Sequence, residues 1–216
     1  MSSQVAELPV RAEARFRMTF EEFLAFAADR HAEWVDGEVT VFLPNSRVHQ
    51  HLFLFLGTLL AWFARRSDLG TVLQAPFAMR VPELRWWREP DILFIAARHL
   101  DRLDDTRLLG PADLAVELIS DESVESDTRT KRLAYQEAGV PEYWLLDPRP
   151  GHQRATFFQI DDAGVFREQP LDARGRYHPR ALPGFWLDPA WLWQDPLPDP
   201  DDLKPLILRQ PADAND

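Results

Sequence analysis

The sequence contains no cysteine, and only two of its 24 basic residues are lysines, Lys131 and Lys204. The absence of cysteine excludes a disulfide framework and any zinc site built from thiolate ligands. The scarcity of lysine means that arginine fills nearly every cationic role on the surface. A lysine retained in such a chain suggests a position where a compact, rotatable ammonium group is needed.

A long apolar run is also absent, since a transmembrane helix needs about 18 consecutive apolar residues. The most apolar segment, HLFLFLGTLLAWFARR, is shorter and ends in Arg65 and Arg66. The first residues, MSSQVAELPVRAEARF, mix charged and small side chains and lack the apolar centre of a secretory signal. We therefore expect a cytoplasmic protein.

The chain has no excess of basic charge, because its formal net charge is −11. Proteins that bind nucleic acid usually carry a basic surface, since phosphate neutralisation dominates their affinity. The net charge therefore counts against a nucleic-acid partner. It does not exclude one, because a net value says nothing about distribution and the segment 188–216 carries much of the acidity.

The composition is that of an ordinary globular domain, with 45% hydrophobic and 27% charged residues among 216. We expect a flexible arm over residues 1–17, one globular domain over 18–187, and a tail rich in proline, aspartate and tryptophan over 188–216. The tail is expected to pack across the domain before its end frays.

Local patterns predict both helices and strands. Thr19 and Glu22 form a capping box that opens a short helix, and Asp36-Gly37 is typical of a tight hairpin turn. Apolar spacing predicts a helix of about five turns over 47–66. A further helix is expected to end at Ala138, with Gly139 directly after it. Either Ser126 or Asp127 can act as its N-cap.

Apolar runs predict the remaining strands, at 71–81 with a bend near Pro76, at 92–96, 113–119 and 142–147, and as a hairpin over 155–160 and 165–168. Strands interleaved with helices favour an α/β (α+β) fold, with a mixed β-sheet flanked by helices.

Three acidic residues stand where the pattern predicts core. Asp91 directly precedes the run ILFIA, Glu117 lies between Val116 and Leu118, and Glu33 interrupts the first strand of the hairpin. A buried carboxylate costs several kcal/mol unless it is paired or bound to metal. Either arginine side chains or a metal ion would supply the compensating charge.

Lys131 is the natural candidate for a cationic partner of functional importance. It shares a helical face with Tyr135, four residues later, on the helix that follows the strand of Glu117. A simpler interpretation treats each residue separately: Asp91 as a turn residue after Pro90, Lys131 as an exposed partner of Asp127, and the buried acids as partners of arginine. The joint arrangement favours the functional interpretation.

Two carboxylates and a lysine form a coherent chemical set. Mg²⁺ binds through one or two carboxylates and takes its other ligands from water and substrate phosphate. A bound ion activates water and offsets charge on phosphorus, and a nearby lysine can orient that water or stabilise the developing oxyanion. The set therefore predicts metal-dependent hydrolysis of a phosphate ester.

Several segments, in order, resemble one known family: EWVDGEV, SRVHQHL, QAPFAMRV, EPDILFI, GPADLAVELIS and DTRTKRLAYQEAGVPEYWLLDP. Together they resemble the Uma-two-type restriction endonuclease family of the PD-(D/E)XK nuclease superfamily. The resemblance runs from about Met18 to Pro148, and more weakly through the following hairpin. It implies a mixed sheet flanked by helices, a Mg²⁺ or Mn²⁺ cofactor, DNA as substrate and a homodimer.

The resemblance also implies roles for individual residues. Pro90-Asp91 matches the PD element, and Glu117 matches the second acid. Ile119 stands where the superfamily has its lysine, so Lys131 on the next helix becomes the expected substitute. Glu33 matches a family acid and is expected to complete the metal shell.

His49, Tyr135 and Gln136 are expected to line the cleft, although a histidine at a helix start is more often a cap or a surface residue, and Tyr135 is as easily core. The competing hypothesis is a catalytically silent module that keeps the fold to bind nucleic acid or a protein, with Trp186, Trp191 and Trp193 forming an interface. A hydrolase acting on phosphate esters outside nucleic acid would use the same site.

Overall fold

The computed structural model describes residues 14–42, 46–121 and 123–209, which form two mixed six-stranded β-sheets flanked by helices. The strands are β1 (Ala14–Arg17), β2 (Ala32–Val35), β3 (Glu38–Val41), β4 (Gly70–Gln74), β5 (Ala78–Val81), β6 (Trp86–Arg88), β7 (Ile92–Ala96), β8 (Arg107–Leu109), β9 (Leu114–Leu118), β10 (Glu142–Asp147), β11 (Arg154–Ile160) and β12 (Phe166–Glu168).

The helices are α1 (Phe20–Phe26), α2 (Arg47–Arg66), α3 (Arg132–Glu137) and α4 (Pro200–Leu208). A π-helical segment, η4 (Ser126–Lys131), leads directly into α3, and the 3-10 segments are η1 (Ala27–Asp29), η2 (Pro82–Leu84), η3 (Ala97–Arg102) and η5 (Pro189–Trp193).

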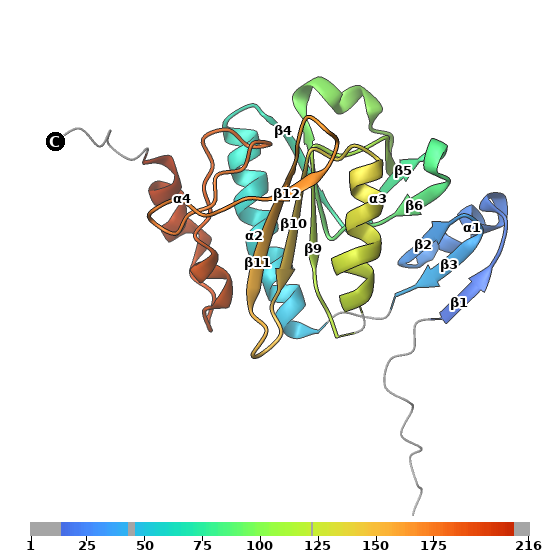
Figure 1. The fold of residues 1–216 in the computed structure, drawn as a ribbon, viewed down its shortest axis with the longest axis horizontal. Helices are drawn as coiled ribbons and strands as arrows, with labels where there is room; N and C mark the ends of the chain where they lie inside the picture. The colour runs from blue at the N-terminus through green and yellow to red at the C-terminus, as the bar shows by residue number, and fades with distance from the viewer. Residues whose placement is uncertain (1–13, 43–45, 122, 210–216) are drawn as a thin grey trace, which may run out of the picture.

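The central sheet has the strand order β12-β11-β10-β9-β7-β4, and the outer sheet has the order β1-β3-β2-β6-β5-β8. Within the central sheet, β9 and β10 run parallel, whereas β7 is antiparallel to β9. The predicted mixed sheet flanked by helices is confirmed, but the strands divide between two sheets. In Figure 1 the outer sheet with α1 forms a separate lobe beside the central sheet.

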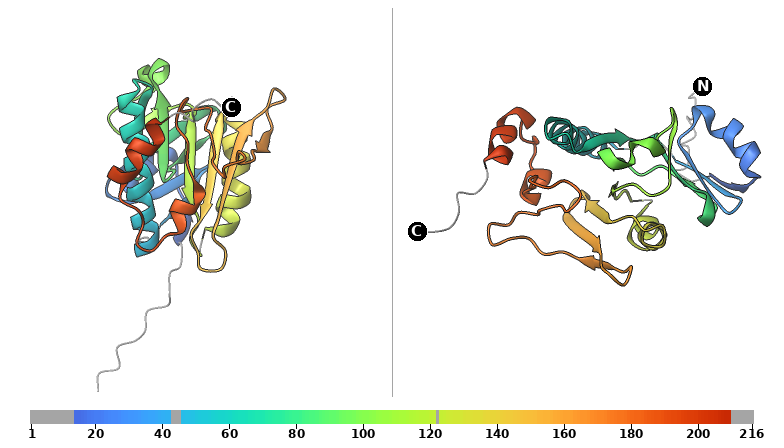
Figure 2. Two further views of the ribbon diagram at one scale, coloured as in Figure 1. Left: turned by 90° about the vertical axis from the view of Figure 1, so that its left-hand side faces the viewer. Right: turned by 90° about the horizontal axis from the view of Figure 1, so that it is seen from above.

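Both faces of the central sheet are covered, so its strands are apolar on both sides. Ile92, Phe94 and Val116 pack toward α2 and the C-terminal segment, while Leu93 and Ala115 pack toward α3. Figure 2 shows α2 and α3 on opposite faces of this sheet. Because side chains alternate along a strand, Glu117 falls on the α3 face together with Ala115.

The locally specified elements agree with the sequence predictions. The helix α2 covers the predicted 47–66, with Ser46 as its N-cap. Thr19 and Glu22 form the predicted capping box of α1. Asp36 and Gly37 both adopt positive φ between β2 and β3, as a tight hairpin turn requires.

Three local expectations were wrong. Residues 14–17, expected in the flexible arm, form β1 and pair with β3, while residues 1–13 lie outside the described part. The predicted bent strand 71–81 is two strands, β4 and β5, in different sheets. Asp127 does not cap its helix, because helical structure begins before it and its side chain is buried beside Lys131.

The C-terminal segment packs onto the domain rather than presenting a tryptophan surface. Trp186, Leu192, Leu203 and Ile207 are buried in the same core as α2. This packing gives no support to an interface built on the tryptophans. None of the helices in the described ranges has both the length and the apolar character needed to cross a membrane.

Candidate functional site

The two central carboxylates face one another across neighbouring antiparallel strands. Ile92 pairs with Val116 in β7 and β9, and continuing this register places Asp91 opposite Glu117. Oδ2 of Asp91 accepts a hydrogen bond of 2.7 Å from the backbone N–H of Leu118. The sheet therefore fixes both acids, although 26 positions separate them in the sequence.

The helix that follows β9 supplies a donor to each oxygen of Glu117. Lys131 Nζ lies 3.0 Å from Oε2, and the Tyr135 hydroxyl donates a hydrogen bond of 2.5 Å to Oε1. The two residues are four positions apart and occupy one helical face, as the sequence predicted. Lys131 is the last residue of the π-helical segment, a type of distortion that is frequent at functional sites.

Lys131 contacts two further carboxylates. Its Nζ lies 3.3 Å from Asp127 Oδ1 and 3.4 Å from Glu33 Oε1. Glu33 Oε2 in turn accepts a hydrogen bond of 2.8 Å from Arg88 on β6. We use the name acidic centre for Asp91, Glu117, Glu33 and Asp127 together with Lys131, all of which are buried.

Carboxyl groups outnumber cationic groups in this buried cluster. Burial raises the pKa of Glu117, and the nearby Asp127, Asp91 and Glu33 raise it further, against the opposing effect of Lys131. Burial lowers the pKa of Lys131, but the surrounding carboxylates raise it well above its ordinary value. Four carboxyl groups thus share one ammonium group and the guanidinium beside Glu33.

Sequence reasoning missed two members of this network. Arg88 gave no distinct signal in an arginine-rich chain. Asp127 did have a sequence signal, because it precedes Lys131 by four residues. That spacing is equally typical of an exposed helical pair. Only the structure shows that Asp127 and Lys131 are both buried, with exposed fractions of 2% and 5%.

The cleft-lining candidates separate into two groups. His49 is buried, with Nε2 3.3 Å from Asp91 Oδ1, so it is neither a side-chain cap nor a surface residue. Tyr135 contacts Glu117, as described. Gln136 lies elsewhere, because its Oε1 accepts a hydrogen bond from the backbone N–H of Phe166 at the start of β12. Ile119, at the position of the superfamily lysine, is buried in the core.

An open cleft of about 550 Å³ reaches the acidic centre at Glu33 and is also lined by Arg88. The β2–β3 hairpin forms one wall, including Phe42 after it, and Ser126 and Thr130 of η4 form the other. A second cleft of about 700 Å³ shares Arg88 and Thr130 and continues along α3. A substrate can therefore approach Glu33 from the side of η4 and α3.

The residues of the acidic centre fit a hard divalent cation. Their potential ligand atoms are carboxyl oxygens, and a cation would favour the ionised form of these buried acids. Within the described part of the chain, no three histidine, aspartate or glutamate side chains are arranged as a ready-made metal site. A Mg²⁺ site needs only one or two carboxylates from the protein, because water and substrate complete its shell.

The two mixed sheets flanked by helices place the protein in the class of nuclease-like α/β folds. The defining pattern of the Uma2 family, described as "Putative restriction endonuclease", matches residues 20–190, and the chain belongs to this family. The resemblance inferred from the sequence is thereby confirmed. A search of curated proteins finds no match.

The fold is similar to that of a crystal structure from Anabaena variabilis, described as "a putative nuclease belonging to DUF820". The TM-score is 0.67 at 14% sequence identity, and the similarity covers 82% of this chain and 97% of the other. At this identity the comparison establishes the shared fold.

Proposed function

We propose that the protein is a metal-dependent endonuclease that hydrolyses phosphodiester bonds of DNA. The observation that carries the proposal is the position of Lys131, whose Nζ lies 3.0 Å from Glu117 on the strand opposite Asp91. This arrangement would supply the second acid and the lysine of a nuclease site, even though Ile119 stands at the position of the superfamily lysine.

Asp91 and Glu117 would hold Mg²⁺ or Mn²⁺, with Glu33 as an auxiliary ligand. When bound, the ion would activate a water molecule and offset charge on the phosphate. His49 would hold the Asp91 carboxylate in position through its 3.3 Å contact. Tyr135 would do the same for Glu117 through its 2.5 Å hydrogen bond.

Lys131 would orient the attacking water, or donate to the oxygen on which charge develops. Its neighbours favour the charged form, because three carboxylates raise its pKa well above the ordinary value. A lysine that remains charged suits electrostatic stabilisation and water positioning better than proton abstraction.

The test combines calorimetry with a cleavage assay on Asp91→Ala and Glu117→Gln variants. Mg²⁺ and Mn²⁺ should bind the wild type, and both variants should lose metal binding and DNA cleavage while remaining folded. Asp113→Asn provides a matched control, because Asp113 is also a buried aspartate beside β9 but bonds to Arg98 and Ala96. Cleavage that persists in Asp91→Ala would refute the proposed role of the site.

A catalytically silent module is the second candidate, because the cleft beside Glu33 carries more carboxylates than guanidinium groups. The same experiment distinguishes the two functions. Absence of metal binding in the wild type would favour the module, and partner binding should then survive Asp91→Ala.

Cytoplasmic location and a homodimer are part of the proposal. In a dimer, each of the two sites would cleave one strand of a duplex. Light scattering of the purified protein gives its mass directly, and a value near 25.0 kDa, the mass of one chain, would contradict the dimer.

A further inference from the structure

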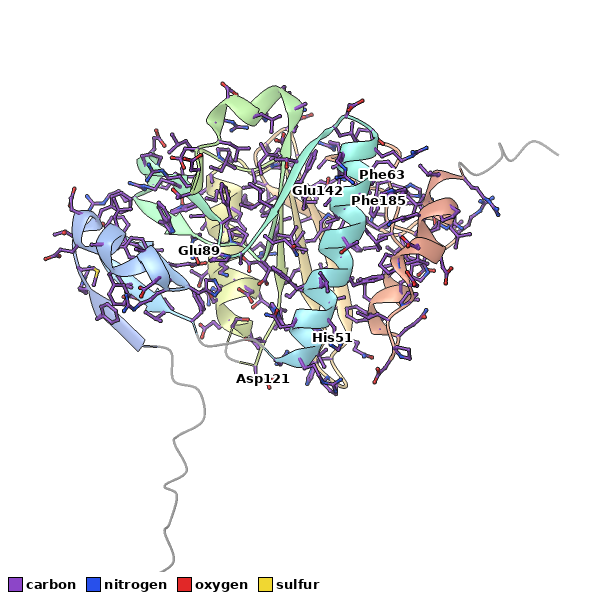
Figure 3. The ribbon with its side chains drawn as sticks, turned by 180° about the vertical axis from the view of Figure 1, so that it is seen from behind. His51, Phe63, Glu89, Asp121, Glu142 and Phe185 are labelled. Atoms are coloured by element: carbon purple, nitrogen blue, oxygen red, sulfur yellow. The ribbon has the colours of Figure 1, made fainter. Side chains whose placement is uncertain are left out.

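A third pocket, of about 810 Å³, is lined by none of the residues of the acidic centre. Its walls come from four segments, within residues 24–31, 74–77, 87–89 and 105–107. Figure 3, the view from behind, shows Glu89 at the junction between the lobe of the outer sheet and the central sheet. The pocket thus lies where the two sheets meet.

The inner wall carries two buried polar atoms without a hydrogen-bond partner among the described residues, Oε2 of Glu89 and Nε2 of His31. They are 3.3 Å apart but do not form a hydrogen bond with each other. Glu89 is only 5% exposed. Buried polar atoms in folded proteins nearly always have a hydrogen-bond partner, in the protein or in water. The polar edge of a ligand in this pocket would supply a partner to the pair.

The other walls suit a flat, uncharged ring. Pro76, Phe77 and Trp87 line the pocket, and Phe77 is half-buried. Two arginines stand at the rim, but Arg30 pairs with Asp29, and Arg107 with Asp104. With its arginines already neutralised, the pocket favours an uncharged aromatic ligand with hydrogen-bonding edges over a phosphate.

The pocket is tied to the acidic centre through the backbone. His31 precedes Glu33 by two residues, and Glu89 precedes Asp91 by two. The backbone N–H of Glu89 also donates a hydrogen bond of 3.3 Å to Glu33 Oε1. A group held by His31 and Glu89 would therefore be held beside the carboxylates proposed to act on phosphate.

We propose that this pocket binds a nucleobase, unstacked from the nucleic-acid strand whose phosphate lies at the acidic centre. Enzymes that read or modify a base commonly take it out of the stack, hydrogen-bond its edge and sandwich its faces between apolar side chains. Here Glu89 and His31 would contact the edge, and Phe77 would contact a face. The geometry of the pocket supports a flat, uncharged ligand with polar edges. The identification of that ligand as a base of a nucleic-acid strand rests on the proposed function.

The first experiment titrates each of the four deoxynucleosides, which carry no phosphate, into the full-length protein in the presence of EDTA. At least one should bind, and inorganic phosphate should not displace it. Glu89→Gln and Phe77→Ala should each weaken binding by roughly tenfold or more. Glu142→Gln is the control, because Glu142 is another buried carboxyl group but belongs to a satisfied network with Tyr177 and Ala181.

The second experiment compares a single-stranded oligonucleotide with an abasic strand of the same length, again without divalent metal. The wild type should bind the base-containing strand roughly tenfold more tightly. Glu89→Gln should remove that preference and leave abasic binding unchanged. No binding by any deoxynucleoside, or equal binding by wild type and both pocket variants, would overturn the proposal.

Failure of the proposed function would have a different signature. Deoxynucleoside binding that depends on Glu89 and Phe77, together with no metal binding at Asp91, would retain the pocket and reject the nuclease. A free nucleoside that binds while strands with and without bases bind equally would contradict an unstacked base of a nucleic-acid strand. Asp91→Ala should leave deoxynucleoside binding in EDTA intact, since Asp91 does not line the pocket.

Discussion

Lys131 holds its ammonium nitrogen 3.0 Å from Oε2 of Glu117, and both side chains are buried. The contact joins the π-helical segment to the central sheet. It also concentrates positive charge where Asp91, Glu33 and Asp127 would otherwise leave uncompensated negative charge. The same contact therefore serves the stability of the domain and the chemistry proposed for it.

Replacing Lys131 by methionine separates these roles. Cleavage of DNA should fall by about 10²- to 10⁴-fold, the range expected for a group acting on the proton or charge of the transition state. Unfolding in urea should show a loss of about 3–5 kcal/mol, because the variant leaves buried carboxylates without their partner.

Mg²⁺ affinity should not decrease in the Lys131→Met variant, since removal of a competing cation makes the site more negative. Calorimetry in parallel with the cleavage assay checks this point. A variant that cleaves at the wild-type rate would show that Lys131 is structural only. Weaker Mg²⁺ binding would show instead that it supports the ligands.

Tyr135→Phe removes the hydroxyl that donates to Glu117 Oε1. The loss should cost about 1–3 kcal/mol of unfolding free energy, because one buried carboxyl oxygen is left without its donor. Tyr143→Phe is the matched control, since its hydroxyl donates to the backbone carbonyl of Asp127 rather than to Glu117.

A positioning role for Tyr135 predicts a difference between these two tyrosine variants in metal binding. Both should be destabilised, but only Tyr135→Phe should weaken Mg²⁺ binding in calorimetry. Equal Mg²⁺ affinities in the two variants would mean that Tyr135 supports the fold without orienting Glu117.

The sequence predicted the parts of this fold whose signals are local. The 20 residues of α2, the capping box at Thr19 and the turn at Asp36-Gly37 each depend on neighbouring residues, so their patterns were sufficient. The division of strands between two sheets depends on long-range pairing, which no local pattern records. The single bent strand predicted over 71–81 failed for that reason.

The site shows the same division. Asp91, Glu117 and Glu33 were recognisable as charges in or beside apolar strands. In the structure Glu33 and Glu117 both contact Lys131, and Asp91 lies opposite Glu117 on the neighbouring strand. The contact of Gln136 with the backbone of Phe166 joins residues 30 positions apart, and no local pattern predicts it.

His49→Ala tests whether the residue beside Asp91 positions a metal ligand. Its Nε2 lies 3.3 Å from Asp91 Oδ1, and such supporting contacts typically change metal affinity by about 10- to 100-fold. His51→Ala is the control, because His51 lies on the same helix but is exposed (Figure 3). Mg²⁺ titrations should show weaker binding only for His49→Ala, and similar affinities for both variants would contradict a positioning role.

The pH dependence of stability should reveal the buried carboxyl group of Glu142, which is remote in sequence from the proposed ligands. Burial raises its pKa above the ordinary 4.5, although Tyr177 and Trp144 donate hydrogen bonds that oppose the shift. The folded state therefore retains this proton where the unfolded state has lost it. Its contribution to stability is fully present below pH 4.5 and declines as the pH rises through the folded pKa.

Glu142→Gln should remove that part of the pH dependence. The variant should be less stable than the wild type at acidic pH, by about 1–3 kcal/mol, because its amide cannot accept all three hydrogen bonds made by Tyr177, Trp144 and Ala181. The difference should narrow toward neutral and alkaline pH, where the wild type must ionise a buried carboxyl group. Urea unfolding of both proteins across this pH range measures the difference. A constant gap would show that Glu142 ionises alike in the folded and unfolded states.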